Sequence, residues 1–392
     1  MLNRRSFISV GSALAALLPM LAGAGRAHAK SGKLPVEYDP RGAVGRLERL
    51  PLLDLESRQD FMAGVTAFST TGELAQAARA HGEAIIKAKG LDPTKELPVE
   101  TATALFESDP VIAMRDRVWF SAHNYEHDIL DGHFKGHAER YLAVLEAADR
   151  AGPGRLELNP DLPIPQYARH EIHQQPGGYV GNPFAGHIYH YATNMFYRGG
   201  NDQDERHLGY AAACPVPQDG GVKRILDLGT GIGQLAVAMK ERFPPAEVTG
   251  LDVAAPMLRY AHMRAVDLDR DVIFTQRLAE DTRYPDGHFD IVISYILFHE
   301  VPADTSRAII AEVHRILRPG GVFYPMDFNL SASATAFRRY GEWKDHRWNN
   351  ERWRLEHATV DFDAEMRKVG FTVEDRSDKT AIFGKITGVK AA

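Results

Sequence analysis

One short segment constrains the fold of this chain more than any other. Residues 224–228 have the apolar character of a buried strand, and Gly229, Gly231 and Gly233 follow at once in a Gly-x-Gly-x-Gly turn that leads into a helical pattern. Glycines can adopt positive φ and let a ligand approach bare backbone, and the third one lets the helix begin close to the strand. The segment therefore predicts a strand, a turn and a helix that hold a ligand at the carboxyl end of the strand.

The spacing of these glycines differs from that of the dinucleotide-binding turn. That turn has the sequence Gly-x-Gly-x-x-Gly and places a pyrophosphate on the helix N-terminus. Here the third glycine comes one residue earlier, and Asp227 stands two residues before the first. A carboxylate at this position repels a pyrophosphate and attracts a cationic amino group. A second acid, Asp252, ends the next expected strand.

Together with three further motifs, this pattern resembles the class I S-adenosylmethionine-dependent methyltransferases. Residues 278–294 resemble the adenine loop and fourth strand of the family, and residues 317–324 resemble its helix end, turn and fifth strand. Residues 298–300 (Phe-His-Glu) are similar to the segment after strand four in the ubiquinone/menaquinone-biosynthesis-like branch. The resemblance covers residues 222–385. It implies an α/β fold with a Rossmann-like, seven-stranded sheet and S-adenosylmethionine as the cofactor.

The resemblance also implies which residues bind the cofactor. The glycine turn would cradle the methionyl part, and Asp252 would bind the ribose hydroxyls. The family usually has Asp where this chain has Leu278, to accept a hydrogen bond from the adenine amine, so Glu280 or Asp281 is expected to take that role. The full set of expected cofactor residues is Asp227, Gly229, Thr230, Gly231, Gly233, Asp252, Val253, Met257, Leu278, Ala279, Glu280, Asp281 and Ser294.

His299 is the strongest candidate for a catalytic residue. It follows the fourth expected strand, at the sheet end from which an acceptor approaches the methyl group. A neutral imidazole there can take a proton from a hydroxyl, an amine or an acidic carbon. Tyr295 is a second catalytic candidate, and Glu300 is a neighbour with a weaker claim. The alternative role for His299, orientation of a loop by hydrogen bonding, remains open at this point.

The first 29 residues have the features of a secretory leader. A basic start with paired Arg4-Arg5 is followed by an apolar run, residues 10–22, and by Ala27-His-Ala29. This order is typical of a twin-arginine signal peptide. It predicts a periplasmic protein that the twin-arginine export machinery carries and that has no membrane span after cleavage. An uncleaved anchor or a misassigned start codon are the alternatives.

Four regions are expected along the chain. Residues 1–29 form the signal peptide, 30–152 a helical region, 153–220 an aromatic and glycine-rich cap or lid, and 221–392 the methyltransferase domain with an insertion at 331–358. The expected strands are 224–228, 247–251, 271–276, 289–294, 321–326, 371–375 and 380–385, and the expected helices of the domain are 233–242, 255–267 and 303–317.

Three expectations concern packing in these regions. The cap is expected either to cover the cofactor or to pack the junction between domains. Val118, Ala122, Tyr125 and Ile129 follow the spacing of one buried helix face. The tryptophans of the insertion, Trp343 among them, are expected to point inward from an amphipathic helix.

Charge and cysteine content exclude several kinds of partner. The formal net charge is −6, and the leader carries arginines but no acids, so cleavage makes the chain more acidic. Nucleic acid is therefore not an expected partner, since its binding depends on Lys and Arg that neutralise phosphates. The single cysteine, Cys214, rules out an intramolecular disulfide and a thiolate metal cluster.

Histidine is abundant, with 17 residues. The pairs His123/His127 and His133/His137 have i, i+4 spacing, which brings two imidazoles to one helix face. His170 and His173 lack the spacing of a zinc-protease motif. With no thiolates and no fixed carboxylate spacing, no metal site is expected.

The sequence thus predicts methyl transfer to a small or medium-sized molecule by an exported enzyme. Export separates such an enzyme from the cytosol, where S-adenosylmethionine is made. Two alternatives therefore remain: a secreted module that binds S-adenosylmethionine, S-adenosylhomocysteine or a nucleoside without methyl transfer, and a lyase or decarboxylase on the same fold.

Overall fold

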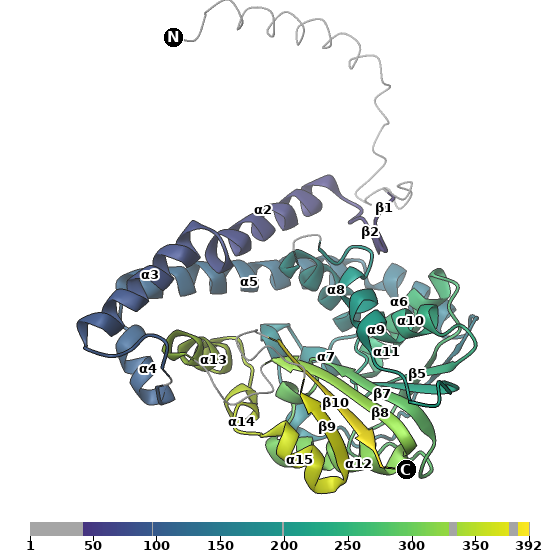
Figure 1. Ribbon diagram of the computed structural model, residues 1–392. Coiled ribbons are helices and arrows are strands. Elements are labelled where there is room, and N and C mark those ends of the chain that lie inside the picture. Colours follow the sequence, from purple (N-terminus) through teal and green to yellow (C-terminus); the bar gives the residue numbers. More distant parts are fainter. Residues whose placement is uncertain (1–41, 96, 198–199, 329–334, 376–382, 392) are drawn as a thin grey trace, which may run out of the picture. The chain divides into compact units, whose positions relative to one another are not determined.

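An eight-stranded mixed sheet lies at the centre of the computed structural model, in the order β3-β6-β5-β4-β7-β8-β10-β9 (Figure 1). The structure describes residues 42–391 except 96, 198–199, 329–334 and 376–382, so the expected signal peptide lies outside the described residues. The strands are β3 (Arg155–Glu157), β4 (Arg224–Leu228), β5 (Glu247–Asp252), β6 (Ile273–Gln276), β7 (Phe289–Tyr295), β8 (Leu317–Phe328), β9 (Phe371–Asp375) and β10 (Phe383–Lys390).

The topology confirms the α/β, Rossmann-like prediction. Strands β3 to β8 pair in parallel, and β10 pairs antiparallel with both β8 and β9. The chain order reverses at β4, whose neighbours are β5 on one side and β7 on the other. Ligands of open α/β sheets bind at such a reversal, beyond the carboxyl ends of the strands.

The number of strands in the sheet differs from the prediction. The expected seven strands are present, and an eighth, β3, pairs in parallel with the outer side of β6. β3 belongs to the region 153–220, the expected cap, for which the sequence indicated no particular strand. It has only three residues, and so short a segment carries no alternating pattern that the sequence could reveal.

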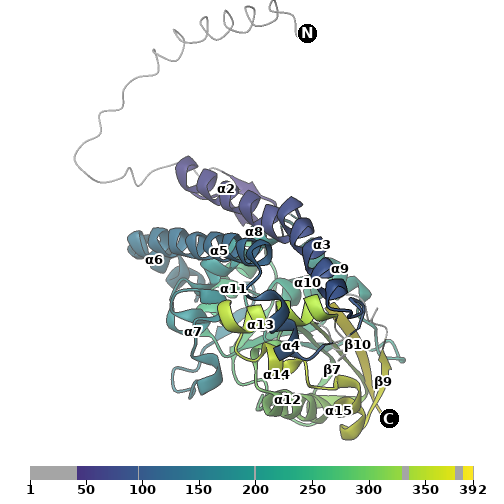
Figure 2. The same cartoon turned by 90° about the vertical axis from the view of Figure 1, so that its left-hand side faces the viewer.

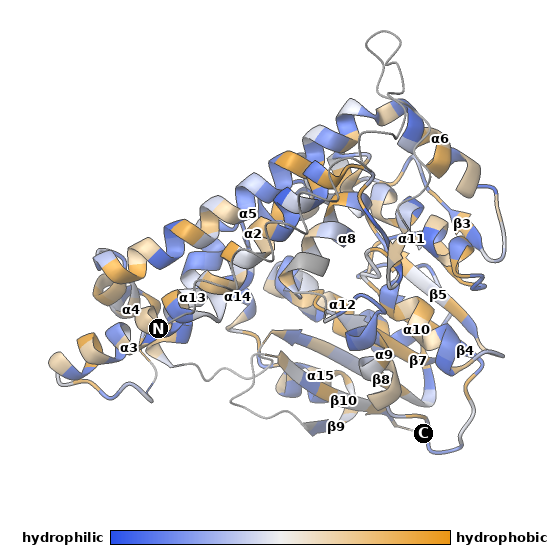
Figure 3. Ribbon diagram, turned by 90° about the horizontal axis from the view of Figure 1, so that it is seen from above, coloured by the Kyte–Doolittle hydropathy of each residue, from blue (hydrophilic) through white to orange (hydrophobic). Residues whose placement is uncertain are grey.

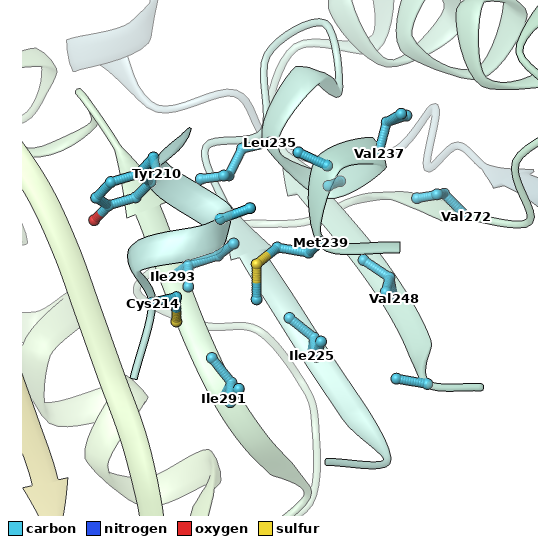
Figure 4. Packing of buried hydrophobic residues seen from close by; sticks show 14 of the residues in the cluster. Tyr210, Cys214, Ile225, Leu235, Val237, Met239, Val248, Val272, Ile291 and Ile293 are labelled. Carbon is cyan, nitrogen blue, oxygen red and sulfur yellow. The ribbon is translucent and has the colours of Figure 1, made fainter. Parts of the chain in front are cut away.

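Helices cover both faces of the sheet. One face packs against α9 (Glu205–Ala213), α10 (Gln234–Arg242) and α11 (Ala255–Asp267), as Figure 4 shows for Leu235 and Met239 over the strands. Every residue of α10 from Gln234 to Met239 is buried. The other face packs against α12 (Ala303–Ile316) and α15 (Phe362–Val369). Burial of both faces fixes the strand ends, and hence the loops that follow them.

A layer of helices from the N-terminal part lies beside the sheet domain (Figures 1 and 2). They are α2 (Leu53–Thr70), α3 (Glu73–Ala88), α4 (Val99–Phe106), α5 (Pro110–Gly136) and α6 (Ala138–Ala148), preceded by the short strands β1 (Ala43–Val44) and β2 (Leu47–Glu48). The long α5 runs beside α2 and also packs against α8 (Ala185–Phe196) of the cap (Figure 3). None of the helices in the described ranges is both long and apolar enough to cross a bilayer.

The buried face of α5 overlaps the predicted one only in part. Ala122 is buried as predicted, but Tyr125 is 49% exposed, and the inner face also carries Trp119, Glu126 and His127. Several residues of this inner face are polar, so a pattern of apolar residues alone does not locate it. The helix also continues through Gly132 to Gly136, although glycine is a poor helix former.

The insertion connects the sheet domain to the N-terminal helices. It forms α13 (Ala336–Trp348) and α14 (Arg354–His357). Tyr340 of α13 is buried against Phe106 of α4, and the ring of Trp343 stacks on Tyr340 with centroids 5.7 Å apart. The inward orientation expected for Trp343 is therefore confirmed.

The N-cap of α5 supplies a first test of this architecture. Asp109 Oδ1 accepts hydrogen bonds from the backbone N–H groups of Val111 and Ile112, at 3.0 and 3.1 Å. We expect Asp109→Ala to lower the free energy of unfolding by about 1 kcal/mol, because these helix-end donors lose their acceptor. Asp109→Asn keeps an acceptor and should cost less. Urea denaturation measures both, with Asp128→Ala on the exposed side of α5 as the control; equal effects of all three variants would contradict the capping role.

Candidate cofactor and acceptor site

The glycine turn after β4 has the backbone conformation that the sequence predicts. Gly229, Gly231 and Gly233 have φ values of 65°, 54° and 75°. A Cβ atom on Gly229 would lie 2.7 Å from Leu297 Cδ1, and one on Gly233 would lie 2.7 Å from Phe274 Cζ. Both positions therefore require glycine for space as well as for conformation.

Asp252 connects the turn to the end of β5. Its Oδ2 accepts a hydrogen bond from Gly231 N–H, and its Oδ1 accepts one from Ala254 N–H, both at 2.9 Å. Burial raises the pKa of Asp252, and the backbone donors act in the opposite direction. The carboxylate borders a cavity at the strand ends, where a ligand hydroxyl can reach it.

That cavity, called the cofactor cavity below, has two walls of different origin. The sheet domain supplies one wall from the loops after the strands, and the cap supplies the other. The sheet wall includes Gly229, Leu251, Asp252, Val253, Ala254, Arg277, Ala279, Ile296, Leu297, Glu300 and Val301, and the cap wall includes Tyr167, Ala168, His170, Ile172, Tyr179 and Val180. Aromatic residues of the cap thus close the space above the glycine turn.

The expected adenine loop places its two acids in different surroundings. Glu280 Oε1 accepts a hydrogen bond from the hydroxyl of Tyr167 at 2.6 Å, and Glu280 Oε2 is buried without a partner among the described residues. Asp281 instead pairs with Arg283 and lines a separate pocket, together with Leu278. Of the two acids that the sequence left open, Glu280 is the one beside the cofactor cavity.

Four other expected cofactor residues lie behind the cavity wall. Asp227, Thr230, Met257 and Ser294 are buried and are not part of the cavity surface. Thr230 Oγ1 donates a hydrogen bond to Asp227 Oδ2 at 2.7 Å. Burial raises the pKa of Asp227 to about 7. In this structure Asp227 therefore holds the turn through Thr230 and does not line the cofactor cavity.

The two catalytic candidates have different surroundings. Tyr295 is not part of the lining of the cofactor cavity, and its hydroxyl is 3.3 Å from the hydroxyl of Tyr197. His299 is buried, with Nδ1 2.6 Å from Asp327 Oδ1. Burial alone would lower the pKa of His299, but the negative charges of Asp327, Glu300 and Glu351 outweigh it and raise the pKa well above 6.5. That environment favours the imidazolium over the neutral base, and a catalytic role for either residue stays a prediction.

His299 belongs to a cluster with its neighbour Glu300 and with two residues from distant segments. His173 comes from the cap, Glu300 follows His299, and Glu351 comes from the insertion. His173 Nε2 is 2.6 Å from Glu351 Oε1, and His299 Nε2 is 3.3 Å from Glu300 Oε1. We call these residues the His/Glu cluster. Sequence reasoning missed Glu351 and the role of His173, because they are 178 residues apart and share no motif.

A second cavity lies on the other side of this cluster. Its volume is about 200 Å³, against about 120 Å³ for the cofactor cavity, and Ile296 borders both. Helix α5, α8 and the insertion supply most of its wall. Its lining includes Thr66, Trp119, His123, Glu126, His127, His173, Gln175, Tyr189, Phe196, Tyr197, Ile296, His299, Phe328, Asp345, Asn349, Glu351 and Phe383.

Part of the second cavity is lined by polar atoms without partners. Thr66 Oγ1, Glu126 Oε1 and His127 Nδ1 are buried and have no hydrogen-bond partner among the described residues. Burial raises the pKa of Glu126 well above 4.5 and lowers that of His127 well below 6.5, so the environment favours the uncharged form of each. Unpaired buried polar groups are costly, which makes this wall suited to a ligand that pairs with them.

A family model and several curated proteins match the part of the chain that contains the glycine turn. The family model described as a methyltransferase domain matches residues 225–321. The chain is 43% identical over 106 residues to demethylmenaquinone methyltransferase of Thermus thermophilus, which covers 27% of this chain and 47% of that protein. It is 35% identical over 124 residues to the ubiquinone/menaquinone biosynthesis C-methyltransferase of Desulfotalea psychrophila, with 31% and 46% covered. The chain spans about half the length of the curated relatives it matches.

Among solved structures, phosphoethanolamine N-methyltransferase 2 of Haemonchus contortus in complex with S-adenosyl-L-methionine is 16% identical. The alignment covers 49% of this chain and 53% of that one, with a TM-score of 0.37.

The sheet order, the glycine turn and the family match define the class. Residues 225–321 lie in a domain with the class I methyltransferase fold, which binds S-adenosylmethionine. The curated relatives of this region include methyltransferases of ubiquinone and menaquinone biosynthesis.

The pKa of Asp227 leads to a testable prediction about stability. An acid whose pKa is raised on folding binds its proton more tightly in the native state, so its contribution to stability is lost as pH rises from about 4 to about 7. We expect Asp227→Asn, which keeps an acceptor for Thr230, to gain about 2–3 kcal/mol relative to the native chain between pH 5 and pH 8. Urea denaturation at both pH values measures this, with Asp60→Asn on the exposed side of α2 as the control. A difference that does not change with pH would contradict the assignment.

Proposed function

We propose that this chain is an S-adenosylmethionine-dependent methyltransferase that acts on a small, uncharged molecule held in the second cavity. The observation that carries the proposal is the arrangement of the two cavities, which meet at Ile296 and at the His/Glu cluster. One cavity lies over the glycine turn, where this fold binds its cofactor. The other begins where a methyl acceptor must approach.

The residues of the cofactor cavity fit S-adenosylmethionine. Asp252 offers a carboxylate to the ribose hydroxyls, Gly229 leaves room for close approach of the ligand, and the free Glu280 Oε2 offers an acceptor to the adenine amine. When bound, the cofactor supplies an electrophilic methyl group. The cap residues Tyr167 and Tyr179 would keep water from it, which aids an in-line displacement once the acceptor is aligned with the methyl group.

The lining of the second cavity supports an aromatic, uncharged acceptor. Trp119, Tyr189, Phe196, Tyr197 and Phe328 offer ring faces for stacking. No Lys or Arg is among the described residues of the lining, whereas Glu351 and Asp345 are. A carboxylate or phosphate ligand would lie beside these two acids, with no Lys or Arg in the described lining to bind it. The relatives named for demethylmenaquinone and ubiquinone support a ring acceptor of this kind.

Calorimetry with S-adenosylhomocysteine tests the cofactor site. We expect Asp252→Ala to weaken binding by about 1–3 kcal/mol, because ligand hydroxyls lose a buried acceptor. The matched control is Asp281→Ala, which removes an acid from the expected adenine loop that points to another pocket. The absence of binding heat in a folded native sample, or equal losses in both variants, would contradict the site.

Turnover separates this proposal from its alternatives. Incubation with S-adenosylmethionine and a panel of uncharged hydroxylated aromatic compounds should release S-adenosylhomocysteine and a methylated product. A chain that binds both ligands but never releases product would instead be a binding module. A product formed without consumption of S-adenosylmethionine would indicate a lyase or decarboxylase on this fold.

We also propose that the protein is exported by the twin-arginine route to the periplasm. The support is sequence alone: Arg4-Arg5, the apolar run and Ala27-His-Ala29. That route carries folded proteins, so the chain can load its ligand before export.

Substitution of Lys-Lys for Arg4-Arg5 tests the export proposal. The variant should accumulate inside the cell as a folded, unprocessed form, whereas the native chain appears in the periplasm beginning at Lys30. Immunoblots of cell fractions and N-terminal sequencing provide the measurement. Native protein that is found only in the cytosol with an intact leader would contradict the proposal.

A further inference from the structure

We infer that the His/Glu cluster is a binding site for one divalent transition-metal ion, placed at the junction of the cofactor cavity and the second cavity. Its two histidines belong to neither of the i, i+4 pairs, and the sequence itself predicts no metal site. One nitrogen or oxygen atom from each of His173, His299, Glu300 and Glu351 lies within 4.8 Å of the others.

The distances between these atoms match those between ligands of one ion. Ligands about 2.1 Å from a metal stand roughly 3 Å apart when adjacent and roughly 4.2 Å apart when opposite. His299 Nε2 is 3.3 Å from Glu300 Oε1 and 4.0 Å from Glu351 Oε2, and His173 Nε2 is 3.7 Å from Glu300 Oε1. His173 Nε2 and Glu351 Oε1, at 2.6 Å, must separate slightly.

The outer nitrogen of each imidazole already has the partner that a metal ligand needs. His299 Nδ1 is 2.6 Å from Asp327 Oδ1, and His173 Nδ1 is 2.9 Å from the hydroxyl of Tyr179. Such partners fix the ring so that Nε2 faces the ion. Asp327 is itself held by the backbone N–H groups of Phe298 and Phe328, both at 2.6 Å. Both Nε2 atoms therefore converge on the same point.

Two carboxylate oxygens of the cluster remain without hydrogen bonds. Glu351 Oε2 and Glu300 Oε2 are buried and have no partner among the described residues. The side chain of Glu351 is only 6% exposed. Unpaired carboxylate oxygens at this depth need a cation, and two glutamates match the charge of a divalent ion.

The ligand types indicate which ions fit. Two imidazoles with two carboxylates suit manganese, iron, cobalt or zinc better than magnesium or calcium, which prefer oxygen ligands alone. Glu300 faces the cofactor cavity, whereas His173, His299 and Glu351 face the second cavity. An open coordination position would therefore be accessible to a molecule in the second cavity.

The position of the ion suggests its role, and this step rests on the proposed function. An ion there would bind the acceptor through a hydroxyl oxygen and lower the pKa of that hydroxyl, so that its proton passes to bulk water before transfer. The deprotonated oxygen then forms the new bond to the methyl carbon, the bond from that carbon to sulfur breaks, and the sulfur keeps the electron pair. The proposed acceptors are thus narrowed to aromatic molecules that carry an unsubstituted hydroxyl group on the ring.

Metal binding by the full chain tests the inference without any activity measurement. Chelator-treated protein is titrated with Mn²⁺, followed by electron paramagnetic resonance, and with Co²⁺, followed by its visible absorption. We expect one ion per chain. Glu351→Gln and His173→Gln should each weaken binding more than tenfold and alter the Co²⁺ spectrum, and the outer-partner variant Asp327→Asn should weaken it about 10–100-fold.

The control variant is His137→Gln, which removes an imidazole from the other histidine group and should bind the ion like the native chain. Circular dichroism and S-adenosylhomocysteine calorimetry on the same samples verify that each variant is folded. Folded native protein that binds no ion, or binding that survives both Glu351→Gln and His173→Gln, would overturn the inference. A chain that binds the ion but not S-adenosylhomocysteine would overturn the proposed function and leave the metal site standing.

Discussion

The close contact between His173 and Glu351 joins parts of the molecule that the sheet alone would leave separate. His173 lies in the cap, and Glu351 lies in the insertion after β8; their side chains meet at 2.6 Å beside His299. The negative charge of Glu351 raises the pKa of His173 against the effect of burial, and its own pKa is lowered to about 2. Without a bound ion, this contact is a buried ion pair, which contributes little net stability because desolvation offsets the attraction. Its effect is to fix where the cap lies, and thereby where one cavity ends and the next begins.

The N-terminal helices complete the second cavity rather than the first. Their inner face presents Trp119, Glu126 and His127 of α5, opposite the ends of β7 and β8. A purely structural helix would bury apolar residues here, since each unpaired polar group costs stability. The polar inner face of α5 therefore suits a binding surface. The packing of α13, from the insertion, against α4 holds the N-terminal helices beside the sheet domain. The relatives share the sheet domain, and about half of their length lies outside the matched region.

The sequence predicted the sheet domain well because its signals are local. The glycine turn, Asp252 and the alternating strands each follow from a few adjacent residues, and the predicted helix 255–267 has the observed bounds. Contacts that join distant segments could not be predicted in this way. The hydrogen bond that holds Glu280 comes from Tyr167, 113 residues away, and the burial of Asp227 beside Thr230 is likewise set by the folded structure. The prediction of the buried face of α5 failed in part for the same reason, because the distant elements packed against this helix decide which of its residues are buried.

The central claim is that cofactor and acceptor occupy two cavities that meet at Ile296 and at the His/Glu cluster. A crystal structure of the chain with bound S-adenosylhomocysteine tests it most directly. The account predicts the ribose at hydrogen-bond distance from Asp252, the adenine beside Glu280 and the sulfur directed toward His299 and the second cavity. A ligand bound among the rings of the second cavity, or one over the glycine turn with its sulfur directed away from His299, would contradict it.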